Sequence, residues 1–133
     1  MRKPILHKKQ PATPLPREFR DSLGRVWRPF ITCQTLTDFE EQTGESLFNP
    51  ETLAKLRGKS MKLLMSLAFL ACDKQINEMT PPLEFRDFTA GFTRADQIQT
   101  VTLAMAGAIE RFFQSQQTDQ AAQNLGTGAT STN

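Results

Sequence analysis

The sequence predicts an α+β fold that is mostly α, with a short N-terminal β-hairpin followed by about four to five helices and with flexible termini. Three observations support this fold class. Two β-like runs lie near a glycine turn at the start, helix start and stop signals recur through the middle, and both ends of the chain are polar. With 133 residues, of which 38% are hydrophobic, the chain has enough apolar material for one modest core.

Composition divides the chain into a basic, Pro-rich flexible arm at residues 1–17, a single globular domain at 18–116 and a disordered polar tail at 117–133. The arm holds four prolines, and the tail is rich in Gln, Thr, Ala and Gly, so neither end can bury much apolar area. Residues 1–28 carry eight Lys or Arg against two Asp or Glu, whereas residues 29–133 carry eight against twelve. A region of net charge +6 therefore precedes one of net charge −4, and a basic arm of this kind can meet nucleic acid, an anionic surface or an acidic partner.

The hairpin is the first element expected. Phe19, Val26 and Trp27 supply bulky side chains suited to half-buried strands, and Asp21 and Gly24 mark the turn between them.

A second β-like run is expected at residues 30–34. Pro29 lacks a backbone N–H, so the second strand should end early at this proline or lie at a sheet edge. Thr35, followed three positions later by Asp38, forms an acidic variant of the capping box and should begin the first helix, which Gly44 ends.

The later helices carry similar signals. Asn49 and Pro50 begin a helix that Gly58 ends, and Ser60 caps the next one. Residues 61–72 are apolar on nearly every side, which places this helix at the centre of the domain or in a subunit contact. It is too short to cross a bilayer, which requires about 20 residues.

Two further helices complete the domain. Thr80-Pro81-Pro82 places proline in the first turn of a helix that Gly91 ends. Thr93 caps the longest helix, whose apolar residues recur at steps of mostly three and four as far as Phe113.

The sequence shows no catalytic or cofactor-binding pattern. The only histidine, His7, lies in the predicted flexible arm, and Cys33 and Cys72 lie in a predicted strand and a predicted buried helix. The glycines are too dispersed for a phosphate-binding loop. We therefore expect a protein that is not an enzyme, with no cofactor or metal, whose cysteines are reduced apolar fillers in the cytoplasm.

Contact with a partner is the remaining function to consider. The candidate contact residues are Trp27, Phe30, Met61, Met65, Phe112 and Phe113, although such residues belong to the core by default. The basic residues near the N-terminus suit nucleic acid, but the acidic helical body and the lack of a basic helix face disfavour that ligand.

The order of several short motifs carries a family resemblance. The motifs are Phe19-Arg20-Asp21, Gly24-Arg25-Val26-Trp27, Ile31-Thr32, Glu41-Gln42-Thr43-Gly44, Ser46-Leu47-Phe48, Phe88-Thr89-Ala90-Gly91, Ala104, Ala108-Ile109-Glu110 and Phe112-Phe113. In this order they resemble the tail assembly chaperone-like proteins of long-tailed bacteriophages and prophages, over about residues 18 to 113. Pro29 and the basic arm depart from the pattern of that family.

The resemblance implies a non-enzymatic protein of the bacterial host cytoplasm, and no membrane partner is expected, because residues 61–72 are too short to cross a bilayer. Its implied partners are the long, helical tape measure protein, which it keeps soluble, and the tail tube protein, which polymerises around the tape measure. Self-association stays open. One alternative is a small structural or adaptor subunit of the phage particle, and a lower-ranked one is a nucleic-acid-binding regulator that uses the basic arm.

Overall fold

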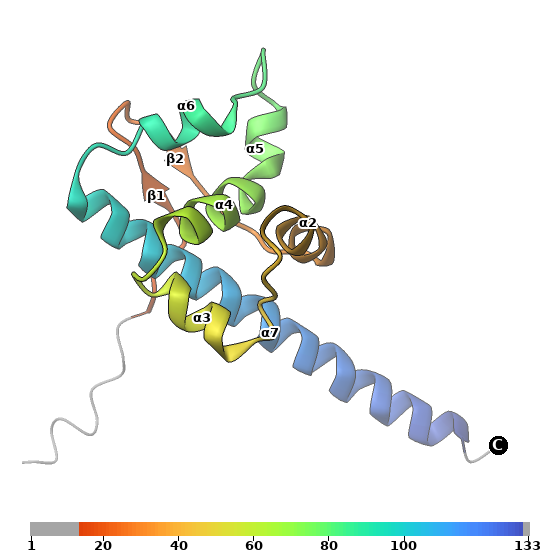
Figure 1. Ribbon diagram of the computed structural model, residues 1–133. Helices are drawn as coiled ribbons and strands as arrows, with labels where there is room; N and C mark the ends of the chain where they lie inside the picture. Colours follow the sequence, from red (N-terminus) through yellow and green to blue (C-terminus); the bar gives the residue numbers. More distant parts are fainter. Residues whose placement is uncertain (1–13, 132–133) are drawn as a thin grey trace, which may run out of the picture.

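The computed structural model describes the backbone of residues 14–131 and the side chains of residues 14–115. Within these residues the chain forms one two-stranded hairpin and six helices, so the predicted α+β, mostly helical fold is confirmed (Figure 1). The elements are β1 (Phe19–Arg20), β2 (Val26–Trp27), α2 (Cys33–Thr43), α3 (Pro50–Leu56), α4 (Met61–Ala71), α5 (Asp73–Asn77), α6 (Phe85–Ala90) and α7 (Ala95–Ser131). Most of the predicted arm, with His7, lies outside the described residues.

Helix α4 is the central element. It contacts α2, α3, α5, α6 and α7, and Figure 1 shows these helices arranged around it. Ser60 caps it as predicted, because its hydroxyl accepts the Leu63 backbone N–H at 3.2 Å. The prediction of a central apolar helix is confirmed by its buried residues, which are Leu63, Leu64, Met65, Leu67, Ala68 and Ala71.

The hairpin turns around the carboxylate of Asp21, whose side chain is fully buried. Oδ1 accepts the backbone N–H groups of Leu23 at 3.0 Å and Arg25 at 2.9 Å. Oδ2 accepts Nε of Arg25 at 2.6 Å and the indole Nε1 of Trp27 at 3.1 Å. Four donors satisfy this carboxylate, and that is the condition under which a charged group can be buried.

The second β-like run is not a strand. Strand β2 ends at Trp27, before Pro29, and α2 begins at Cys33. The capping box is formed by Thr32 and Thr35 instead of Thr35 and Asp38, because each Thr hydroxyl accepts the other residue's backbone N–H, at 3.2 and 3.0 Å. The helix therefore starts earlier than predicted.

Several other helix ends agree with the sequence. Gly44 ends α2 with φ of 74°, and the Asn49 side chain caps α3 by accepting the Glu51 N–H at 2.9 Å. Residues 73–77 form a further short helix, α5, directly after α4. Helix α6 begins at Phe85 instead of at the proline pair, since a residue that precedes proline is disfavoured in helical conformation.

Helix α7 continues to Ser131, although the composition of residues 117–133 predicts a disordered tail. Figure 1 shows this C-terminal part projecting beyond the other elements. Residues 15 and 16 of the predicted arm lie against α7, because a Cβ added to Gly107 would lie 3.1 Å from Cβ of Leu15 and 3.3 Å from the Pro16 carbonyl oxygen.

Candidate partner-binding surface

The segment between β2 and α2, residues 28–32, is called the linker here. Burial alternates along it, since Pro29 and Ile31 are buried while Arg28, Phe30 and Thr32 are exposed. This is the period of an extended chain, in which successive side chains point to opposite faces. The alternation leaves the Phe30 ring 72% exposed.

Side-chain and backbone contacts hold the linker in place. The Phe30 N–H donates to the carbonyl oxygen of Ala71 at 2.9 Å. The Gln75 amide attaches both the linker and β2 to α5, because its Oε1 accepts the Arg28 N–H at 2.6 Å and its Nε2 donates to the Val26 carbonyl oxygen at 2.9 Å. The linker is thus fixed to the junction of α4 and α5, and Phe30 is presented from a held backbone.

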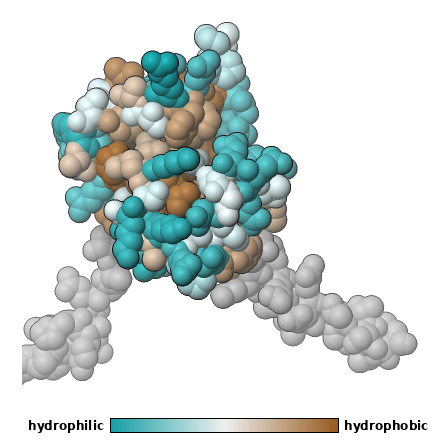
Figure 2. Space-filling view, in the orientation of Figure 1, coloured by the Kyte–Doolittle hydropathy of each residue, from teal (hydrophilic) through white to brown (hydrophobic). Residues whose placement is uncertain are grey.

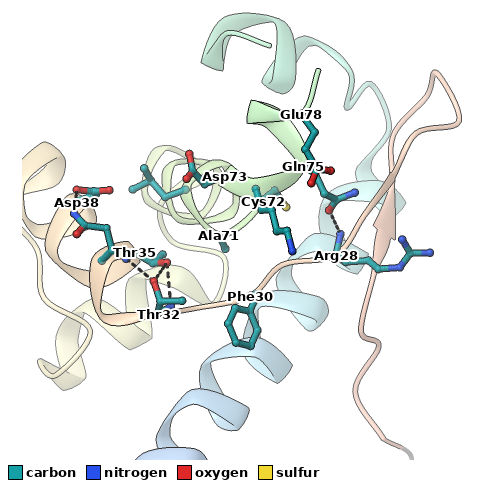
Figure 3. Close-up of a pocket in the computed structure, with 13 residues that line it drawn as sticks. Arg28, Phe30, Thr32, Thr35, Asp38, Ala71, Cys72, Asp73, Gln75 and Glu78 are labelled. Atoms are coloured by element: carbon teal, nitrogen blue, oxygen red, sulfur yellow. Dashed lines mark hydrogen bonds between the residues drawn. The ribbon is translucent and has the colours of Figure 1, made fainter. Parts of the chain in front are cut away.

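One groove, called groove 1, lies between the linker, α2 and the junction of α4 and α5, and has a volume of about 680 Å³. Figure 3 shows Thr35 and Asp38 on one side of it, residues of the α4–α5 junction on the other, and Phe30 at its edge. Its charged lining residues have both signs: Arg28, Lys74, Asp38, Asp73 and Glu78.

A second groove, called groove 2, lies on the other side of the linker and has a volume of about 520 Å³. Arg28, Phe30 and Thr32 line both grooves, so Phe30 stands between them. The apolar lining residues of groove 2 are Pro29, Phe30, Ile31, Ala108 and Phe112. Its charged lining residues are Arg17, Arg28 and Arg111, which are called the arginine cluster.

The arginine cluster has little internal compensation. Arg28 pairs with Glu18 at 3.2 Å, but both side chains are well exposed, at 69% and 42%, so this ion pair is weak. Within the described part of the chain, no hydrogen bond or ion pair holds the Arg17 or Arg111 guanidinium. Burial and the neighbouring charge of Arg17 lower the pKa of Arg111, against the opposing effect of Glu110.

The structure separates the predicted contact residues into two groups. Phe30 and Met61 are exposed, at 72% and 54%, and Phe113 is half-buried. The other three, Trp27, Met65 and Phe112, are core residues that are 2%, 3% and 8% exposed. The side chains of these three residues fill the interior of the domain, and of the three only Phe112 also lines a groove.

Only two of the six come together at the grooves. Phe30 and Phe112 both line groove 2, whereas Met61 lines neither groove. Phe48, which was not among the predicted contact residues, is 66% exposed and packs against Phe113 with ring centroids 5.5 Å apart. In the sequence, Phe48 directly precedes the predicted helix cap Asn49, and this position gives no signal that the ring is exposed.

The two cysteines differ in environment. Cys72 is buried as predicted, and burial raises the pKa of its thiol to about 12. Cys33 is exposed and lines groove 2 at the start of α2, so the prediction that it is an apolar filler in a strand is wrong.

Apolar surface is dispersed on the face drawn in Figure 2, where brown hydrophobic residues are interrupted by teal hydrophilic ones. Over the described residues, no helix is long and apolar enough to cross a membrane. Nor does the part of the chain with described side chains contain a group of three or more His, Cys, Asp or Glu residues that could hold a metal ion.

Comparisons with protein-family models, curated proteins and solved structures gave no match.

Proposed function

We propose that the protein is a non-enzymatic, phage tail assembly chaperone-like protein that binds a tape measure protein in the cytoplasm of a bacterial host. The order of its sequence motifs supports this family. The observation that carries a binding function is the Phe30 ring, which is 72% exposed on a held backbone between grooves of about 680 and 520 Å³.

A held aromatic ring is an efficient anchor for a partner. Aromatic side chains contribute strongly to binding because they bury a large area and lose little conformational freedom. The backbone of Phe30 is already ordered by its hydrogen bond to Ala71, so a partner does not have to order it.

The two grooves fit a helical partner. A helix presents apolar side chains at steps of three and four, and such side chains can lie on either side of a ridge. By the family resemblance the tape measure protein is long and helical, so its side chains can cover Phe30 and enter the flanking grooves. The tail tube protein is the second partner that the resemblance implies.

The test is co-expression with the tape measure gene that the proposal expects beside this one. We expect the tape measure protein to become more soluble and to co-purify with the native chain, and to do neither with Phe30→Ala. Leu23→Ala is the matched control, because Leu23 is also 72% exposed but lies in the hairpin turn. A tape measure protein that is equally soluble alone and never co-purifies would refute the proposal.

Mass spectrometry of purified virions tests the alternative of a structural or adaptor subunit. A chaperone should be absent from mature particles, whereas a structural subunit should be present in a fixed copy number. Detection in fixed copy number would therefore replace the chaperone function with the structural one.

A further inference from the structure

The two grooves differ in charge. Groove 2 is lined by three arginines and by no Asp or Glu among the described residues, whereas groove 1 has Asp38, Asp73 and Glu78 beside Arg28 and Lys74. A partner that lies across Phe30 therefore meets a positive groove on one side and a groove of mixed charge on the other.

Helix α2 adds to the positive potential of groove 2. Thr32 and Cys33 line the groove, which places the N-terminal end of this 11-residue helix there. The N-terminus of a helix carries a partial positive charge, and no acidic residue occupies the first turn of α2 to offset it. The helix end and the arginine cluster thus act in the same direction.

We infer that the arginine cluster binds the carboxylate side chains of an acidic amphipathic helix whose apolar face covers Phe30. This inference rests on the proposed function, since it specifies the chemistry of the partner segment. Arginine suits the role because its planar guanidinium can donate two parallel hydrogen bonds to one carboxylate.

The apolar lining of groove 2 favours a peptide of this kind. Phe30, Ala108 and Phe112 lie in the same groove as the arginines, so one occupant can bury apolar atoms and pair its carboxylates at once. Partial removal of water on binding strengthens these pairs relative to pairs on an open surface.

Nucleic acid is a poorer fit to the same surface. A phosphate backbone that crossed Phe30 would leave groove 2 and meet the carboxylates of Asp38, Asp73 and Glu78 in groove 1. Phosphate contacts supply most of the affinity for nucleic acid, and these three carboxylates would oppose them.

The test uses the full chain and two synthetic helices of about 20 residues, which span about 30 Å. Both peptides carry one leucine face; one has glutamates beside it, and its twin has glutamines at the same positions. Affinity is measured by fluorescence anisotropy of labelled peptide at low salt and again at high salt. We expect the glutamate peptide to bind about tenfold more tightly at low salt, and this difference to shrink at high salt.

Variants then locate the effect. Replacing the arginine cluster by Arg17→Gln, Arg28→Gln and Arg111→Gln together should abolish the preference for glutamate. Arg86→Gln is the matched control, because Arg86 is an exposed arginine outside both grooves, and it should keep the preference. Circular dichroism verifies that each variant is folded. A third peptide, with lysines at the glutamate positions, is a charge control, and it should bind the native protein more weakly than the glutamine peptide does.

Three results would overturn the inference. They are equal binding of the glutamate and glutamine peptides, no binding of either peptide, and tighter binding of mixed-sequence single-stranded DNA than of the glutamate peptide. Failure of the proposed function is distinct, since it is read from co-purification of the tape measure protein. If that protein still co-purifies in a Phe30-dependent way while the two peptides bind equally, the inference about charge falls and the proposed function stands.

Discussion

The buried carboxylate of Asp21 offers the sharpest test of how this fold is held together. Asp21→Asn keeps the size of the side chain but replaces one acceptor oxygen by an N–H₂ group that cannot accept a hydrogen bond. Two of the four donors lose their acceptor, and the Arg25 guanidinium loses its counter-ion in a site where the Asp21 side chain is fully buried.

The magnitude follows from those two donors. Leaving a buried donor unsatisfied costs about 1–3 kcal/mol, so two of them give about 2–6 kcal/mol. The side chain of Arg25 is 25% exposed and can recover some hydration, which places the expected loss of unfolding free energy at about 2–4 kcal/mol. For a domain of this size, the melting temperature should fall by about 10 °C.

Urea denaturation followed by circular dichroism and by the fluorescence of the single tryptophan, Trp27, measures the loss. Trp27 is a suitable probe because its indole N–H binds Asp21 directly. Glu41→Gln is the control: Glu41 is an exposed carboxylate on α2, and its replacement should change stability by no more than about 0.5 kcal/mol. A loss below about 1 kcal/mol for Asp21→Asn would refute the view that this carboxylate organises the hairpin.

The same group predicts how stability depends on pH. Burial raises the pKa of Asp21, but hydrogen bonds from the Arg25 side chain, Trp27 and the Arg25 backbone, with the charge of Arg25, outweigh it and hold that pKa below its ordinary 3.8. The folded chain thus binds this proton less readily than the unfolded chain. The contribution of Asp21 is present above pH 3.8 and is lost as pH falls through the lower, folded-state pKa, so Asp21→Asn should flatten the acid limb of the stability curve.

Three further changes test other parts of the fold. Gly91→Ala should reduce the unfolding free energy by about 1–3 kcal/mol in urea, since the added Cβ would lie 2.9 Å from Nη2 of Arg25, which is itself buried. Thr32→Ala should cost about 1 kcal/mol in the same assay, because it removes the hydroxyl that caps α2. In native protein, Ellman's reagent should modify the exposed Cys33 and spare the buried Cys72 until urea unfolds the chain; rapid reaction of both thiols would contradict the burial of Cys72.

The linker shows where sequence patterns stop being informative. Burial alternates from Trp27 to Thr32 with the period of a strand, and the residue types at positions 30–34 predicted a β-like run that overlaps this segment. A strand also needs a neighbouring strand for its backbone groups. Here that need is met by Ala71 and Gln75, far along the chain, whose pairing with the linker no local pattern reveals.

The helices were more predictable because their signals are local. The predicted helix starts at Asn49 and Ser60 and the predicted helix end at Gly44 are all observed. The arginine cluster, in contrast, combines two residues near the hairpin with Arg111 on α7. Arg111 follows Glu110 in a helix with no basic face, so its place in a positive groove depends on tertiary packing alone.

The exposed aromatic ring is the strongest reason to assign a binding role to the linker. The contacts that fix the linker use the backbone of Phe30 and Arg28 and the side chain of Gln75, and none of them requires a phenyl ring at position 30. An alanine there could keep the same backbone contacts, so Phe30→Ala should leave the unfolding free energy within about 0.5 kcal/mol of native. If this variant is as stable as native protein and yet fails to bind the tape measure protein, the ring serves recognition. If it is destabilised by several kcal/mol, the ring belongs to the fold and its exposure loses its functional meaning.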